Sequence, residues 1–353
     1  MPCTVVDLFC GVGGLTKGLE LANLNVVAGI DIDETCRFAY ENNNNSRFIQ
    51  KDMTAVAVEE IRSLYPENHI KVLVGCAPCQ PFSKYTQRYR KDGHKDDKWR
   101  LLYSFSNLVE QIHPDIVSME NVPELVKEQV FDDFVSVLQK EGYSCSWQIV
   151  YCPDYGVPQK RKRLVLLASR LGEIELIPPI YYEATYRTVR DAIADLPALD
   201  SGEIDTHDSV HRATRLTDIN KRRIRQSVQG GTWNDWDEDL KLECHKKRTG
   251  KSYGAVYGRM NWDEPSPTIT TQFYGYGNGR FGHPEQDRAI SYREGAVLQS
   301  FPPDYAFIPE DEELFSLRRL GIHIGNAVPV ELGRAIGMTI SQHLRNVEVA
   351  DNG

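Results

Sequence analysis

The sequence has little that would place it in a membrane, in a disulfide-bonded scaffold or around a zinc ion. No apolar run approaches the ~20 residues that a membrane-spanning helix needs. The eight cysteines show no disulfide-framework spacing, so we expect reduced thiols, one of which could be a nucleophile. Cys76 and Cys79 form a CxxC pair, but the sequence has no second pair of ligands at the spacing that a zinc site needs. No metal site is therefore expected. The N-terminus lacks the features of a signal peptide, which favours a cytoplasmic protein.

Basic residues are also fewer than acidic residues, so that the formal net charge is −9 at pH 7. Binding to phosphate groups requires a basic surface, so the negative net charge argues mildly against a nucleic-acid partner. Lysines and arginines are nevertheless concentrated at residues 160–163, 212–225 and 241–251. The charge therefore leaves open a basic surface on an acidic protein.

Short apolar runs alternate with amphipathic stretches in the first half of the chain, a pattern that predicts βαβ units and a mainly parallel sheet. We expect a helix over residues 14–23 and strands over residues 4–9, 25–30, 72–75, 116–119 and 164–168.

The pattern changes after about residue 176. Two prolines follow at 178 and 179, and the stretch to about residue 281 is rich in glycine, proline and aromatic residues. It predicts a domain of short strands and loops, with one helix at 220–226. A helical pattern returns at 330–343 and is expected to pack back on the first domain. We therefore predict a first domain of residues 1–177 that is completed by residues 320–353. Residues 178–319 are predicted to form a second domain together with a hinge.

Closely spaced glycines follow the first predicted strand, in DLFCGVGG at residues 7–14. Such glycines let a backbone approach a nucleotide-like ligand. Asp31 ends the second strand, where a carboxylate would accept hydrogen bonds from ribose hydroxyls, and Asp52 could bind an adenine amino group. The spacing is not GxGxxG, so the glycines alone do not decide between such a ligand, a dinucleotide and a plain turn.

Cys79 lies in CAPCQPFS, directly after the predicted strand at 71–75, between two prolines that stiffen the loop. Glu120 ends another predicted strand. If the two strands are neighbours, a thiol and a carboxylic acid share one cleft. This pair suits attack on a cytosine ring, because a thiolate added to carbon 6 makes carbon 5 reactive and an acid at nitrogen 3 assists the addition. A redox CxxC pair is the alternative, and otherwise Cys76 is expected only to pack at the strand end.

Taken in order, the motifs resemble the DNA cytosine-5 methyltransferase family of the prokaryotic or phage type. They are DLFCGVGG, GIDID, KDM, GCAPCQPFS, MENVPEL, QKRKR, REGAVLQSFP and GNAVP, and they cover residues 4 to about 337 apart from the middle. The resemblance implies an α/β fold. A Rossmann-like S-adenosylmethionine-dependent methyltransferase domain would face a smaller, mostly β/loop target-recognition domain across a DNA-sized cleft.

The resemblance also implies roles for individual residues. Cys79 matches the nucleophile, Glu120 the group acting on nitrogen 3, and Arg161 and Arg163 the basic pair of the active site. Residues implied to bind S-adenosylmethionine are Phe9, which would stack on the adenine, Gly11, Gly13, Gly14, Asp31, Ile32, Asp52, Met53, Leu101, Asn326 and Ala327. Gln80, Ser83 and Lys160 are assigned to DNA. The chain departs from the family at 97–105, where many relatives have a Gly-Thr-Leu segment, and at Ala327, which replaces a common serine.

The implied substrate is a cytosine of double-stranded DNA, flipped out of the stack. Residues of about 178–287 would read base edges in the major groove. A tRNA cytosine-5 methyltransferase is the first alternative, and a DNA-binding protein that has lost catalysis is the second. We further expect a cytoplasmic, nucleoid-associated monomer, with a restriction endonuclease as a functional partner.

Overall fold

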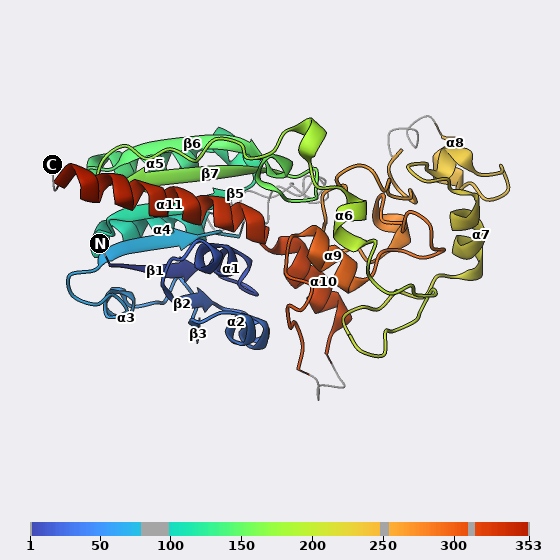
Figure 1. Cartoon of the computed structure of the whole chain (residues 1–353), viewed down its shortest axis with the longest axis horizontal. Coiled ribbons are helices and arrows are strands. Elements are labelled where there is room, and N and C mark those ends of the chain that lie inside the picture. The colour runs from blue at the N-terminus through green and yellow to red at the C-terminus, as the bar shows by residue number, and fades with distance from the viewer. Residues whose placement is uncertain (1, 79–98, 248–253, 310–314, 352–353) are drawn as a thin grey trace. The chain divides into compact units, whose positions relative to one another are not determined.

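The computed structural model describes residues 2–78, 99–247, 254–309 and 315–351 (Figure 1). The chain divides into two compact units. The first, here called the sheet unit, comprises residues 1–151, 162–179 and 328–353, and the second, the loop unit, comprises residues 152–161 and 180–327. Each unit is described by itself. None of the described helices is both long enough and apolar enough to cross a membrane.

The sheet unit is built on a seven-stranded sheet of order β3-β2-β1-β4-β5-β7-β6. Its strands are β1 (Cys3–Leu8), β2 (Val26–Asp31), β3 (Arg47–Gln50), β4 (Ile70–Gly75), β5 (Ile116–Asn121), β6 (Ser144–Tyr151) and β7 (Lys162–Ser169). The first five strands run parallel, and β7 is antiparallel to both β5 and β6. The chain order reverses between β1 and β4, and α/β sheets bind ligands outside the carboxyl ends of the strands at such a point.

Helices cover both faces of this sheet (Figure 1). Helices α1 (Gly14–Leu21) and α11 (Val330–Asp351) pack together on one face. Gly18 permits this contact, since an added Cβ would lie 2.4 Å from the backbone nitrogen of Arg334. The apolar sides of α4 (Arg100–Ile112) and α5 (Gln129–Lys140) bury the main core against the other face. The unit also contains α2 (Arg37–Asn43) and α3 (Val58–Arg62).

The five predicted strands correspond to β1, β2, β4, β5 and β7. Strand β6 was not predicted, because its sequence SCSWQIVY mixes polar and apolar residues and three consecutive side chains are exposed at this edge of the sheet. The helix predicted at 330–343 is confirmed. It continues to Asp351 and packs against α1.

The loop unit is rich in loops, as predicted, but its described residues form no named strand. The predicted short strands are reduced to isolated bridges, such as those between Gln159 and Ser266 and between Arg259 and Gly282. Its helices are short: α6 (Val189–Ile193), α7 (Asp218–Gln226), α8 (Glu243–Lys246), α9 (Tyr292–Leu298) and α10 (Leu317–Asn326). Buried charges help to hold these loops. Arg288 donates two hydrogen bonds of 2.7 Å to Glu294, and both side chains are almost fully buried.

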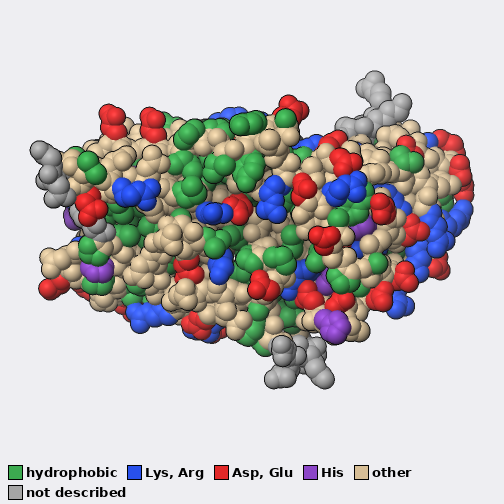
Figure 2. Space-filling model, viewed as in Figure 1, with side chains coloured by type: hydrophobic (Ala, Val, Ile, Leu, Met, Phe, Trp, Pro, Cys, Tyr) green, Lys and Arg blue, Asp and Glu red, His purple; other side chains and the backbone are tan. Residues whose placement is uncertain are grey.

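Neighbouring acids pair with part of the basic stretch at residues 212–225. On α7, Arg222 pairs with Asp239 and Arg225 pairs with Asp287, while Arg223 is buried. In Figure 2, red and blue side chains accordingly alternate over this part of the surface. The concentration of lysine and arginine in the sequence therefore does not translate into one uniformly basic face on α7.

The division differs from the predicted domain boundaries at three places: residues 152–161 and 320–327 belong to the loop unit, and residues 178 and 179 belong to the sheet unit. Backbone hydrogen bonds explain the first difference: the Lys160 N–H donates to Ser266 O, and the Ser266 N–H donates to Pro158 O. Close packing explains the second. A Cβ added at Gly325 would lie 2.5 Å from the backbone of Thr270, so only glycine allows α10 to approach that segment so closely.

Candidate active site

The residues predicted to be functional gather where parallel strands of the sheet unit end. The glycine-rich turn follows β1, Asp31 ends β2, Cys76 follows β4 and Glu120 lies near the end of β5. Because these strands run parallel, their carboxyl ends lie along one edge of the sheet. Cys79, Gln80 and Ser83 lie outside the described residues.

The turn after β1 contains three residues in the left-handed region: Phe9 (φ 60°), Gly11 (φ 51°) and Gly13 (φ 88°). Gly13 precedes the first residue of α1, Gly14. A Cβ added at Gly11 would meet no atom within 4 Å, so open space lies before this backbone. The turn therefore leaves room for a ligand to approach the main chain closely.

Asp31 connects this turn to the end of β2. Its Oδ2 accepts a hydrogen bond from the Gly11 N–H at 2.9 Å, and its Oδ1 accepts one from the Asp33 N–H at 2.9 Å. Burial raises the pKa of Asp31, and the two backbone donors oppose this effect. The next side chain, Ile32, is 63% exposed. A carboxylate and an apolar surface thus stand side by side, as a ligand with a sugar and an aromatic base requires.

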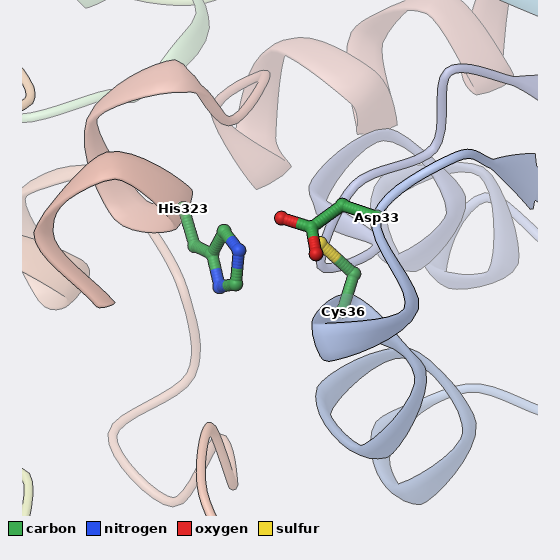
Figure 3. A group of neighbouring side chains, drawn as sticks. All are labelled: Asp33, Cys36 and His323. Atoms are coloured by element: carbon green, nitrogen blue, oxygen red, sulfur yellow. The ribbon is translucent and has the colours of Figure 1, made fainter. Parts of the chain in front are cut away.

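The chain after Asp31 turns into the short 3-10 helix η1 (Glu34–Cys36), with Asp33 accepting hydrogen bonds from Thr35. Figure 3 draws Asp33 and Cys36 of the sheet unit and His323 of the loop unit. Among the described residues, neither unit by itself brings three such metal-ligand side chains together.

Three further predicted cofactor residues differ in their exposure. The Asp52 Oδ1 accepts hydrogen bonds from the backbone and side chain of Thr54, and these bonds lower the pKa of Asp52. The side chain of Met53 is buried in the main core, and Leu101 packs against that core while remaining partly exposed. Asp52 and Leu101 can therefore offer side-chain atoms to a ligand, whereas Met53 can offer only its backbone.

Glu120 is a buried carboxylate with a protein partner on each oxygen. Its exposed fraction is 2%. Oε1 lies 2.9 Å from Nε of Arg163 in an ion pair that lacks hydrogen-bond alignment, and Oε2 accepts a hydrogen bond from the Cys76 thiol at 2.8 Å. The antiparallel pairing of β7 with β5 brings Arg163 to this position, since Asn121 on β5 faces Leu164 on β7.

The expectation that Cys76 only packs at the strand end is wrong, because its thiol bonds directly to Glu120. Next to this bond, the Asn121 side-chain amide donates to Ala77 O at 3.1 Å. Two side chains thus join the chain after β4 to the end of β5. No sequence signal distinguished Cys76, since a thiol at a strand end is ordinarily a small core residue.

The two arginines predicted as a pair have different surroundings. Arg163 belongs to the sheet unit and pairs with Glu120. Arg161 belongs to the loop unit, where its buried guanidinium donates to Ile269 O at 3.0 Å and to Gly325 O at 3.3 Å. Lys160 is exposed and pairs with Glu264. Of the predicted catalytic residues that are described, the sheet unit brings together Glu120 and Arg163.

The family model of C-5 cytosine-specific DNA methylases matches residues 3–342 of the chain. The chain belongs to this family. The Type II methylase M.HgiDII of Herpetosiphon aurantiacus is 55% identical over 97% of this chain and 96% of its own length. The Type II methyltransferase M.Eco47II of Escherichia coli is 30% identical over 96% of this chain and 78% of its own length. The chain is therefore an enzyme, a DNA cytosine-5 methyltransferase.

Solved structures support the fold. A putative DNA modification methyltransferase from an E. coli prophage superposes with a TM-score of 0.74 at 20% identity, covering 97% of this chain and 99% of its own. The Dnmt2 methyltransferase of S. pombe gives a TM-score of 0.65 at 18% identity, covering 98% of this chain and 99% of its own. The predicted Rossmann-like methyltransferase fold is confirmed.

Beneath the glycine turn of this methyltransferase lies a buried acid that sequence reasoning did not single out. Asp7, on β1, is 1% exposed, and its Oδ2 accepts a hydrogen bond from the Thr16 hydroxyl at 2.7 Å. Thr16 also bonds to the Tyr40 hydroxyl, which accepts a hydrogen bond from Ser46. Burial raises the pKa of Asp7 to about 7. The folded protein therefore binds a proton at Asp7 at pH values where the unfolded chain does not.

This proton makes stability depend on pH, and Asp7→Asn should remove the dependence. The raised pKa stabilises the fold fully below the ordinary aspartate pKa of 3.8, and this contribution is lost as the pH rises through about 7. At about 1.4 kcal/mol per pH unit, wild type should lose roughly 2 to 3 kcal/mol relative to Asp7→Asn between pH 5 and 8. Urea unfolding of both proteins at several pH values measures this difference. A difference that stays constant with pH would contradict the raised pKa.

Proposed function

We propose that this enzyme transfers a methyl group from S-adenosylmethionine to carbon 5 of cytosine within one short sequence of double-stranded DNA, through a covalent bond between Cys79 and carbon 6. The observation that carries the proposal is the buried Glu120, held by Arg163 and Cys76 next to the strand that leads to Cys79. Membership of the C-5 cytosine-specific family supports the choice of base and of ring position.

The residues after β1 and β2 fit S-adenosylmethionine. Open space lies before the Gly11 backbone, the Asp31 carboxylate has lone pairs beyond its two backbone bonds, and Ile32 is largely exposed. We assign Asp31 to the ribose hydroxyls, and Ile32 and Phe9 to the adenine faces. The other residues assigned to S-adenosylmethionine are Gly11, Gly13, Gly14, Asp52, Met53 through its backbone, Leu101, Asn326 and Ala327. When bound, S-adenosylmethionine supplies an electrophilic methyl group.

The chemistry assigned to the protein is addition to the cytosine ring and its reversal. The Cys79 thiolate forms a bond to carbon 6, while the acid form of Glu120 donates a proton to ring nitrogen 3. Carbon 5 becomes nucleophilic in this adduct. Arg163 lies against Glu120 and balances the negative charge that remains on the carboxylate after proton donation. Once carbon 5 carries the methyl group, a base such as water takes the carbon 5 proton. The bond between carbon 6 and sulfur then breaks, the thiolate leaves, and nitrogen 3 returns its proton to the Glu120 carboxylate.

DNA recognition is assigned to residues 178–319, with base reading centred on 178–287. The target base would flip into the pocket, at a cost of a few kcal/mol that contacts to the extruded base offset. Arg161, buried among backbone carbonyls of the loop unit, is assigned to holding that unit's structure. M.HgiDII and M.Eco47II are named as Type II enzymes, so we further propose a restriction–modification role beside a cognate endonuclease, with the methyltransferase acting as a monomer.

Product analysis tests this function directly. Purified protein, labelled S-adenosylmethionine and mixed-sequence duplex DNA should yield 5-methylcytosine as the labelled base. Bisulfite sequencing of DNA from cells that express the protein should place the methyl groups in one short sequence. Label found only in tRNA, or on the amino groups of adenine or cytosine, would contradict the proposal.

A further inference from the structure

Glu120 differs from Asp31, the acid at the end of β2, in how its carboxylate is held. The Asp31 carboxylate accepts from two backbone N–H groups. The Glu120 carboxylate is instead held by two side chains, Arg163 on Oε1 and the Cys76 thiol on Oε2. Its orientation therefore depends on side-chain identity, which a substitution can change.

The Cys76 thiol donates this hydrogen bond. The thiol carries the hydrogen and a carboxyl oxygen offers lone pairs, so Cys76 is the donor and Oε2 of Glu120 the acceptor. Because Glu120 is 2% exposed, water is poorly placed to replace a lost donor at its carboxylate. Removing the thiol would leave the Glu120 carboxylate with Arg163 as its partner on Oε1 and with no donor on Oε2. The carboxylate could then rotate about its contact with Arg163.

The backbone of Cys76 is itself fixed, which makes its side chain a firm support. The Cys76 N–H donates to Leu8 O on β1, and the following carbonyl, that of Ala77, accepts from the Asn121 amide on β5. The residue is thus anchored to both strands that flank β4. Such supporting contacts set the orientation of a catalytic group, and a displacement of about 1 Å can cost about a hundredfold in rate.

We propose that Cys76 is a positioning residue for this reaction, and that its thiol hydrogen bond sets the orientation in which Glu120 presents its proton to nitrogen 3. This inference rests on the proposed function. It gives the first cysteine of CAPC a part in the chemistry distinct from that of Cys79: Cys76 acts through Glu120 and forms no bond to substrate.

Four variants of the full-length protein test the role of the thiol. Cys76→Ala and Cys76→Val both remove the hydrogen-bond donor. Alanine leaves a space where the sulfur was, and valine nearly fills that space. Cys76→Ser keeps a donor. Cys145→Ala is the matched control, since this half-buried thiol lies on β6 and bonds only weakly to Tyr143 O. For each, kcat, the KM values for DNA and S-adenosylmethionine, and the thermal unfolding midpoint are measured, with kinetics taken well below that midpoint.

Both donor-less variants should lower kcat about tenfold or more with KM changed by less than about twofold, because the lost interaction acts on the chemical step. Cys76→Ser should recover most of the rate, and Cys145→Ala should match wild type. Wild-type kcat in Cys76→Ala and Cys76→Val, or equal losses in the serine and alanine variants, would overturn the positioning role alone. A wild-type enzyme that does not methylate carbon 5 would overturn the proposed function and this inference together.

Discussion

A DNA duplex carrying 5-fluorocytosine at the target position should become covalently attached to the wild-type protein, and Cys79→Ala should abolish both the attachment and turnover. After methyl transfer, a proton must leave carbon 5 before the thiolate can be expelled from carbon 6. Fluorine cannot leave as the proton does, so the thioether persists. Loss of the nucleophile should reduce turnover by at least about 10⁴-fold, since the remaining groups cannot form the covalent intermediate. Denaturing electrophoresis of labelled duplex detects the adduct.

Controls separate this chemistry from a redox reaction of the CxxC pair. Strong reductant should leave the wild type active, because no disulfide takes part. Cys145→Ala should still form the adduct. An adduct that forms in Cys79→Ala would contradict the assignment of the nucleophile, and inhibition by reductant would favour disulfide chemistry.

Glu120→Gln should slow addition to the ring by about 10² to 10⁴-fold, the usual contribution of a positioned acid or base. Glutamine has nearly the same shape, but it cannot supply an acidic proton to nitrogen 3. It also removes the charge that pairs with Arg163, whose side chain is only 15% exposed. Binding of S-adenosylmethionine should be retained, because Glu120 is not among the residues assigned to it. Single-turnover kinetics and calorimetric titration measure the two effects separately.

Glu59→Gln is the matched control for this variant. Glu59 also pairs with an arginine of the sheet unit, Arg62, but both side chains are exposed. Exposed ion pairs contribute little, so its activity and stability should stay close to those of wild type. If Glu120→Gln added to the ring at the wild-type rate, another group would have to act at nitrogen 3.

Much of the fold was predictable because local patterns determine single elements. The apolar runs of β1, β2, β4, β5 and β7 have the composition of buried strands, which period and composition reveal. Strand β6 lacked this signal, since an edge strand needs few apolar side chains. The loop unit was harder to predict. The conformation of its loops depends on interactions such as the buried ion pair of Arg288 and Glu294, and no sequence periodicity predicts such a pair.

The sequence by itself determined the family, the parallel βαβ half and the motif residues. Closely spaced glycines, prolines and strand-end acids can be recognised from the few residues on either side of them. Only the tertiary structure decided which of these side chains meet. Cys76 and Glu120 are 44 residues apart and become partners because β4 and β5 are adjacent in the sheet. Arg161 and Arg163, two residues apart, have different partners because β7 begins between them, at Lys162. Arg163 on this strand pairs with Glu120, while the Arg161 guanidinium donates to backbone carbonyls of the loop unit. Long-range strand pairing and burial set these outcomes, and neither is encoded in the spacing of neighbouring residues.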